Sequence, residues 1–95
     1  MIPSSRTPTH PGEILREEFL SPLGISQVAF ARRIGVPLQR VNEIVRGRRG
    51  VTSETAWLFS QALGTTPQFW LTLQTNFNLA ASRPRKEIAR LRKSA

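Results

Sequence analysis

Residues 26–47, SQVAFARRIGVPLQRVNEIVRG, carry apolar side chains at helical spacing on both sides of a short break. The apolar residues that share one face are Phe30, Ala31 and Ile34 before the break and Val41, Ile44 and Val45 after it. Gly35 suits the position just past a helix, and Pro37 suits the first turn of the next one. Ser26 can cap the first helix with its hydroxyl group. The pattern therefore predicts two short helices joined by a tight turn.

Two helices joined in this way cross at about 90–120°, the arrangement of a DNA-binding helix-turn-helix. In that arrangement the N-terminal part of the second helix faces base edges in the major groove. Gln39 and Asn42 can pair with adenine, and Arg40 can pair with guanine. The alternative is an ordinary two-helix corner with a solvated polar face.

The remaining hydrophobic pattern predicts three more helices, so we expect an all-α fold of five helices with a central helix-turn-helix. One helix begins at His10-Pro11 and is closed by Pro22 and Gly24. Another begins after Thr52 or Ser53 and ends at Gly64, and the last covers residues 67–81 after Thr66. The expected organisation is a flexible arm over residues 1–9, a domain over 10–82 and a basic tail over 83–95.

The last predicted helix, PQFWLTLQTNFNLAAS, is more apolar than an outer helix requires. Its apolar stripe at helical spacing is Phe69, Leu73, Phe77 and Ala80. We expect one face to pack on the core and another to form a homodimer interface, because aromatic residues are enriched at interfaces. The candidates for that interface are Trp70, Leu71 and Phe77. The alternative is that all of these side chains close a small core.

Charge supports the nucleic-acid interpretation. The 95 residues have a formal net charge of +8, concentrated in two blocks, residues 32–49 and 83–95, each with a net charge of +5. Two basic blocks on a nearly neutral body are typical of a protein that contacts phosphate. There is no cysteine, no apolar run long enough for a membrane span and no hydrophobic signal segment. We therefore expect a cytoplasmic protein without a membrane partner.

Catalysis is not expected. Glu13, Glu17 and Glu18 share one predicted helix, but paired catalytic carboxylates need a cleft. A solvated face or a docking surface for a basic partner explains them better. His10 is the only histidine, so it is a helix-entry residue rather than a metal ligand. No metal and no cofactor are expected.

The order of HPGEIL, GISQVAFARRIGVP, QRVNEIVRGRRGVT and TAWLFSQALGTTPQFWLTLQ resembles the HigA family of antitoxins, within the lambda-repressor-like helix-turn-helix superfamily. The resemblance covers residues 9–81. It implies a homodimer that binds double-stranded operator DNA in its own promoter. It also implies a partner, a HigB- or RelE-like mRNA endonuclease toxin, which the antitoxin binds and neutralises. We take Glu13, Glu17 and Glu18 as candidate toxin contacts.

Carried onto this sequence, the resemblance divides the DNA contacts into two sets. The residues directed toward bases are Leu38, Gln39, Arg40 and Asn42. The residues directed toward the phosphate backbone are Gln27, Arg46, Arg48 and Arg49. The basic tail lies beyond the resemblance. A solvated segment and a weak helix over residues 86–93 that adds nucleic-acid affinity both remain open for it.

Two other functions fit the sequence. One is a stand-alone transcriptional regulator without a toxin, which the neighbouring gene would distinguish from an antitoxin. The other is an RNA- or ribosome-associated adaptor that uses the basic blocks.

Overall fold

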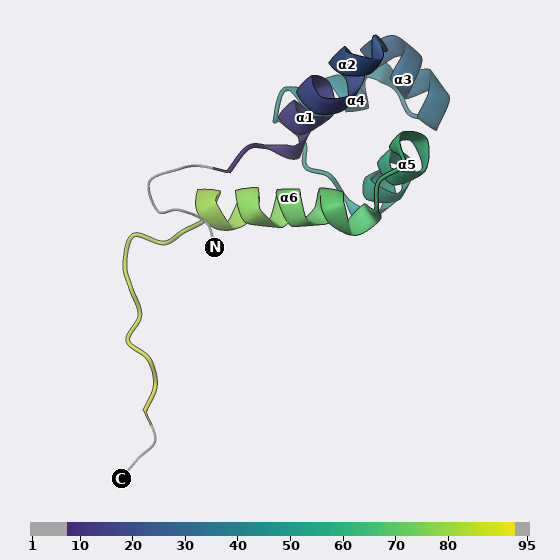
Figure 1. Ribbon diagram of the computed structural model, residues 1–95. Helices are drawn as coiled ribbons and strands as arrows, with labels where there is room; N and C mark the ends of the chain where they lie inside the picture. The colour runs from purple at the N-terminus through teal and green to yellow at the C-terminus, as the bar shows by residue number, and fades with distance from the viewer. Residues whose placement is uncertain (1–7, 93–95) are drawn as a thin grey trace.

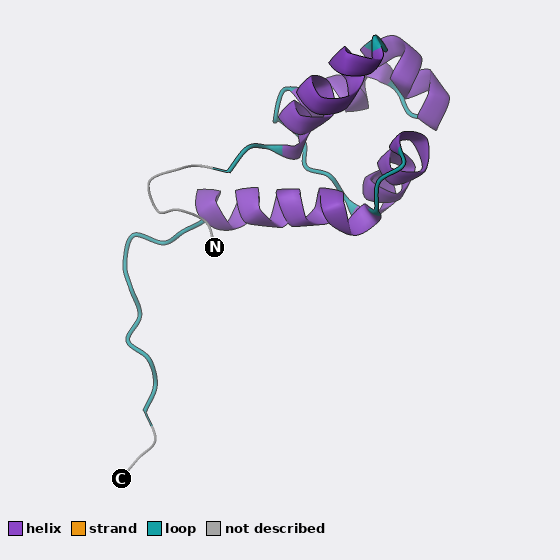
Figure 2. Ribbon diagram, viewed as in Figure 1, coloured by secondary structure: helices purple, strands orange, loops and turns teal. Residues whose placement is uncertain are grey.

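A computed structural model describes residues 8–92, and within that range it contains five helices and no strand (Figures 1 and 2). The predicted all-α fold is confirmed. The expected N-terminal arm falls almost entirely on residues 1–7, which lie outside the described residues, as do residues 93–95 of the basic tail.

The first helix begins at Pro11 and runs to Leu23 through three segments, α1 (Pro11–Ile14), η1 (Leu15–Leu20) and α2 (Ser21–Leu23). His10 caps it, because its Nδ1 accepts a hydrogen bond of 2.9 Å from the Gly12 N–H. The sequence predicts the start correctly, but Pro22 lies inside the helix rather than closing it. A wider π-helical turn, η1, precedes this proline, and its last bond joins the Ser21 N–H to the Arg16 carbonyl.

The central helix-turn-helix consists of α3 (Gln27–Ile34) and α4 (Leu38–Val45). Ser26 caps α3 through a 3.0 Å bond from the Ala29 N–H to its hydroxyl oxygen. Gly35 adopts the left-handed conformation, with φ 73°, and Val36 then donates back to the Ala31 carbonyl at 3.0 Å. These bonds make the turn that the sequence predicts.

The last two helices are α5 (Ser53–Leu63) and α6 (Pro67–Ala81), capped by the hydroxyl groups of Thr52 and Thr66. In Figure 1, α6 runs along the opposite side of the molecule from the first helix, and α5 closes one end. None of the described helices is long and apolar enough to cross a membrane.

The core is built around a chain of aromatic rings from different helices. Trp70 lies at its centre, with ring centroids 5.1 Å from Phe59 and 5.4 Å from Phe19, and Phe59 contacts Phe30 at 5.5 Å. The indole N–H of Trp70 donates to the Thr65 hydroxyl at 2.7 Å, so the buried polar group is satisfied. Each such aromatic side chain removes a large apolar area from water, so this cluster holds α3, α5 and α6 together.

One predicted interface residue is wrong. Trp70 is 0% exposed and belongs to the core, so it cannot lie at a dimer interface in this fold. The buried face of α6 is centred on Trp70 and Gln74 rather than on the predicted stripe, and Phe69 is partly exposed at its edge. Trp70 therefore helps to close the small core, as the alternative interpretation of the last helix expected.

Gly12 sets the separation of α1 and α4. A Cβ atom at this position would overlap the carbonyl group of Ile44 in α4. Only glycine therefore lets the first helix lie directly against the second helix of the helix-turn-helix. This contact supports α4 from the side opposite its polar face.

Beyond Ala81 the chain leaves the domain. Residues 83–92 form no helix and are exposed throughout, and Figure 1 shows them running away from the end of α6. A weak helix in the tail is therefore absent from the described part of it.

Candidate nucleic-acid interface

Helix α4 has one buried side and one polar side. Val41 and Ile44 are fully buried in the core, whereas Gln39 and Arg46 are exposed on the opposite side. Asn42 lies between those two at helical spacing and is half-buried. The core contacts thus hold α4 rigidly while its polar face points to solvent, which is the arrangement that a major-groove helix requires.

Gln27 and Asn42 connect the two helices of the motif. The Asn42 amide donates to the Gln27 side-chain oxygen at 3.3 Å, across fifteen positions of sequence. The family resemblance implies Gln27 near phosphate and Asn42 near bases, and the structure brings the two side chains together at the edge of the polar face. This bond orients both amides before any ligand arrives.

Arg40 lies on a flank of α4 rather than at the centre of its polar face. Its guanidinium group is 3.6 Å from the carboxylate of Glu54 on α5. Leu38, in the first turn, is exposed on another side of the helix. The four residues predicted to face bases therefore spread around the N-terminal half of α4, and Arg40 has a protein partner that the sequence did not reveal.

Glu43 is a site residue that the sequence prediction missed. It is half-buried at the middle of the polar face, and it accepts from the Arg49 Nε at 2.8 Å and from the Gln39 amide at 3.4 Å. The spacing of four residues between Gln39 and Glu43 is a helical signal that could have indicated the first contact. The contact with Arg49 depends on the following loop and has no such signal.

That loop, residues 46–50, is called the basic loop here because it carries Arg46, Arg48 and Arg49, all exposed. Its start is tied to α4 by a 2.8 Å bond from the Arg48 N–H to the Glu43 carbonyl. Just past its end, the Val51 N–H donates to the buried side-chain oxygen of Gln74 at 2.7 Å. The loop is thus held at both ends, and its arginines are presented on a fixed backbone.

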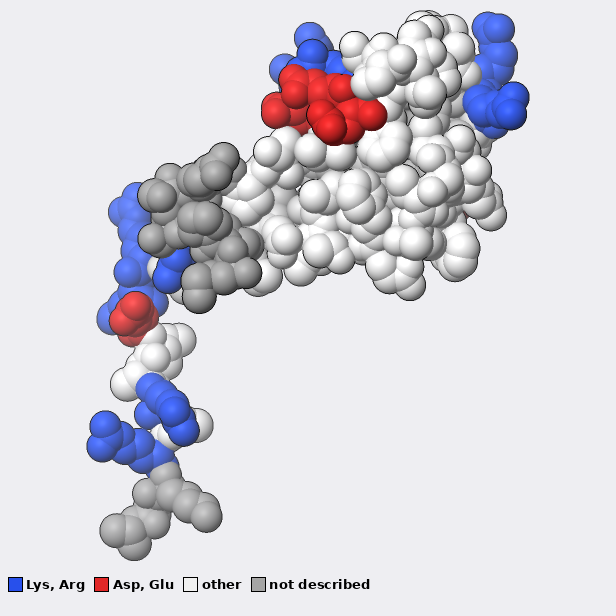
Figure 3. All heavy atoms as spheres, viewed as in Figure 1, with Lys and Arg blue, Asp and Glu red and all other residues white. Residues whose placement is uncertain are grey.

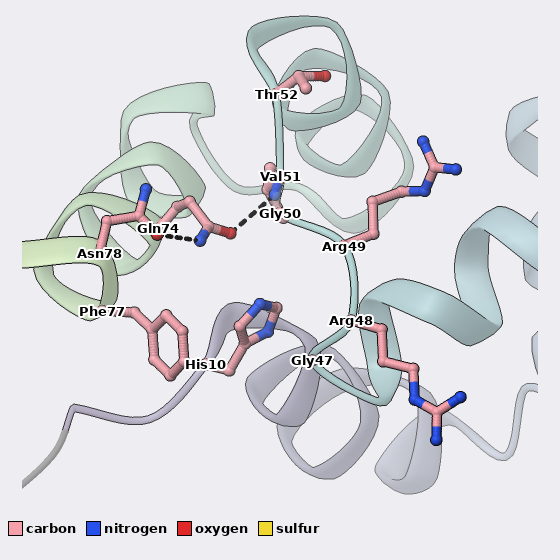
Figure 4. Close-up of a pocket in the computed structure, with 10 residues that line it drawn as sticks. All are labelled: His10, Gly47, Arg48, Arg49, Gly50, Val51, Thr52, Gln74, Phe77 and Asn78. Atoms are coloured by element: carbon pink, nitrogen blue, oxygen red, sulfur yellow. Dashed lines mark hydrogen bonds between the residues drawn. The ribbon is translucent and has the colours of Figure 1, made fainter. Parts of the chain in front are cut away.

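The basic loop and α6 enclose a shallow hollow of about 390 Å³ (Figure 4). Figure 4 shows Gln74 and Asn78 facing the loop, whereas the side chains of Arg48 and Arg49 point away from α6. His10 lies at one wall, edge-on to Phe77 with ring centroids 4.8 Å apart. Burial lowers the pKa of His10 below its ordinary value, so the ring is neutral and accepts the capping bond at neutral pH.

The predicted acidic contacts form a separate surface. Glu13, Glu17 and Glu18 are all exposed on α1 and η1, and Figure 3 shows an acidic patch over this part of the first helix. Arg16 pairs with Glu17 at 3.2 Å, but both side chains are more than half exposed, so the pair contributes little to stability. Glu13 and Glu18 form no ion pair among the described residues, and the weak pair with Arg16 leaves Glu17 accessible, so all three carboxylates can meet a basic partner.

Residues 8–92 contain no group of three or more His, Cys, Asp or Glu side chains that could hold a metal ion. The polar face of α4 and the basic loop are suited to binding nucleic acid. They combine amide groups that recognise base edges with guanidinium groups that recognise phosphate.

Comparison with known proteins agrees with this geometry. A family model described as helix-turn-helix matches residues 15–70. Virulence-associated protein I of Dichelobacter nodosus is 45% identical over 82% of this chain and 72% of its own length. Antitoxin HigA-1 of Vibrio cholerae is 40% identical over 90% of this chain and 80% of its own.

The structure is similar to that of Pseudomonas aeruginosa antitoxin HigA with the higBA promoter. That chain is 44% identical, with a TM-score of 0.77 over 79% of this chain and 82% of its own. This chain therefore belongs to the helix-turn-helix family and, within it, to the HigA antitoxins.

Proposed function

We propose that this protein is the antitoxin of a type II toxin–antitoxin pair. It binds operator DNA as a homodimer, represses its own operon and neutralises a RelE-like mRNA endonuclease by direct contact, in the cytoplasm and without catalysis of its own. The observation that carries the proposal is the polar face of α4 with the basic loop beside it. A similar HigA chain was solved with promoter DNA, which supports the same use of this face.

In the proposed complex, α4 enters the major groove with its N-terminal half toward the bases. Gln39 and Asn42 provide amides, Arg40 provides a guanidinium group, and Leu38 can contact a thymine methyl group. Arg40 must exchange its contact with Glu54 for one with DNA. That exchange costs little, because an ion pair at the protein surface typically contributes only about 0–1 kcal/mol. Gln27, Arg46, Arg48 and Arg49 then fix the position of the helix through phosphates.

The two proposed kinds of DNA contact differ in salt dependence. Binding to the promoter upstream of its own gene and to a scrambled duplex would be measured by fluorescence anisotropy over a range of salt concentrations. Arg40→Ala should weaken promoter binding by about 1–3 kcal/mol and reduce discrimination between the two duplexes. Arg48→Ala should weaken both equally and reduce the salt slope by about 1. Discrimination that is unchanged in Arg40→Ala would remove this residue from base recognition.

We propose the acidic surface, Glu13, Glu17 and Glu18, as the toxin contact. It lies on the first helix, separate in sequence and in charge from α4 and the basic loop. Its carboxylates would attract a basic partner and make the encounter dependent on salt.

Co-expression with the product of the neighbouring gene tests this assignment. The wild-type protein should suppress toxicity and co-purify with that product, and the variant Glu13→Gln/Glu17→Gln/Glu18→Gln should do so less well while still binding DNA. If the wild-type protein neither co-purifies nor suppresses toxicity, it is a stand-alone regulator. If the variant behaves as wild type, the toxin binds elsewhere.

We also propose a homodimer. Leu71 and Phe77 remain candidate interface residues, because both are only half-buried in the monomer. A two-fold dimer would place two copies of α4 about 34–36 Å apart, or at a multiple of that distance, to match successive turns of DNA.

A further inference from the structure

The basic tail is the strongest charged feature that the proposed contacts leave unused. Residues 83–92 carry five cationic side chains against the single carboxylate of Glu87. The cationic residues are Arg83, Arg85, Lys86, Arg90 and Arg92. Figure 3 shows basic side chains spaced along the whole extended segment. Among residues 8–92, no hydrogen bond or ion pair ties this segment to the domain, so its charges are available to a partner.

The tail begins just past the hollow that α6 shares with the basic loop. Asn78, one helical turn before the end of α6, lines the same hollow as Arg48 and Arg49 of the basic loop. The tail starts just after that turn. Ten residues in extended conformation can span up to about 33–36 Å, so the tail can reach well beyond the footprint of α4. Its attachment point and its reach together favour contact with the duplex that flanks the operator.

The chemistry of the segment favours phosphate over other partners. Four of its five cations are arginines, whose planar groups bind phosphate oxygens in pairs. Pro84 disfavours a helical conformation for Arg83 and helps to keep the start of the segment extended. Ile88 and Leu91 are 92% and 95% exposed, and two large apolar side chains are too few for a membrane-binding stripe.

We propose that residues 83–92 are a second DNA-binding element, an arm that contacts backbone phosphates flanking the operator. The inference rests on the proposed operator binding, and it adds a contact that is independent of base sequence. The arm increases affinity and salt dependence without changing which sequence α4 selects. Each phosphate that it neutralises steepens the dependence of log K on log salt by about 0.9.

The experiment compares wild type with the variant Arg83→Gln/Arg85→Gln/Lys86→Gln/Arg90→Gln/Arg92→Gln. Binding would be measured on a short promoter duplex, on the same duplex extended by about 10 base pairs at each end, and on scrambled duplexes of both lengths. For wild type, the extension should increase affinity on promoter and scrambled DNA alike. In the variant this gain should disappear and the salt slope on long DNA should become shallower by about 2–4.

The matched control is Ile88→Ser/Leu91→Ser, which removes the apolar side chains and retains every charge. It should behave as wild type, and both variants should melt as wild type does, because every residue of the segment is exposed. The proposed arm would be wrong if wild type bound the short and extended duplexes with equal affinity. It would also be wrong if the glutamine variant kept the salt slope of wild type on the extended duplex. If the serine control lost the increase in affinity on the extended duplex, the phosphate-binding arm would be rejected in favour of an apolar contact between protein chains. Failure of wild type to prefer promoter over scrambled DNA would contradict operator binding instead, and the length effect on scrambled DNA would still test the arm.

Discussion

At the scale of single residues, the start of the first helix determines how firmly α4 is held. Gly12 permits the close contact between α1 and the backbone of Ile44, and His10 caps the same helix. Neither residue is among the proposed DNA contacts. Both residues influence DNA binding only by holding α4 in place. Substitutions at these positions should therefore change the free energy of unfolding.

Gly12→Ala should decrease the free energy of unfolding by at least about 1–3 kcal/mol, because the added methyl group overlaps backbone atoms that cannot rotate away. Urea denaturation followed by circular dichroism measures the change. Thr72→Ala, at an exposed position of α6, is the control and should stay within about 0.5 kcal/mol of wild type. Equal stability of the two variants would show that α1 and α4 are not in contact.

The pH dependence of stability should reveal His10. Burial lowers its folded-state pKa below 6.5, so as the pH falls the unfolded chain binds the proton first. The contribution of neutral His10 to the free energy of unfolding is therefore complete above pH 6.5, and it decreases as the pH falls from 6.5 through the folded-state pKa. His10→Asn keeps a capping acceptor but cannot titrate. The difference in unfolding free energy between wild type and His10→Asn should therefore change between pH 6.5 and the folded-state pKa of His10. A difference that stays constant between about pH 8 and pH 5 would contradict the lowered pKa of His10.

At the scale of elements, local signals predict where most helices begin and end, although Pro22 lies inside the first helix, and tertiary contacts decide which faces are buried. Caps such as Ser26 and Thr66 and the turn at Gly35 act within a few residues, so their effects are visible in the sequence. The faces of α6 were predicted wrongly because apolar residues occur on several sides of it. A contact between Gln74 and Val51, 23 positions apart, helps to orient the helix, and no sequence periodicity reports it.

The same distinction applies to the candidate site. The polar face of α4 follows from helical spacing, and the structure places Gln39, Asn42 and Arg46 on it. The partners of two arginines, Glu54 for Arg40 and Glu43 for Arg49, depend on how α4, α5 and the basic loop meet. Their charges were visible in the sequence, but their distances were not.

Gln74→Leu tests the contact that ties α6 to the basic loop. It should decrease the free energy of unfolding by about 1–3 kcal/mol, because the Val51 N–H stays buried without an acceptor. Amide hydrogen exchange at Val51 should also become faster. Asn78→Ala removes only the outer bond to Gln74 and should have a smaller effect on both quantities. An exchange rate at Val51 that is unchanged in Gln74→Leu would exclude this bond.

At the scale of the whole molecule, the main excess of positive charge and the main cluster of carboxylates lie on different elements. The basic loop lies beside α4, and the acidic surface lies on the first helix. The basic tail leaves α6 just past the hollow that α6 shares with the basic loop. Such a distribution suits a protein that holds DNA with one part and a basic protein with another. A dimer would double both surfaces and make the DNA site symmetric.

Selection of bound duplexes from a random-sequence pool tests the central claim, that α4 selects DNA sequence, most directly. Wild type should enrich a two-fold symmetric motif with half-sites about 34–36 Å apart or a multiple of that distance. Gln39→Ala/Asn42→Ala should still fold, because neither side chain belongs to the hydrophobic core and the lost Asn42–Gln27 bond is only partly buried, and the variant should lose or change that motif. Enrichment of no motif by wild type, or of the same motif by both proteins, would contradict sequence recognition by this helix.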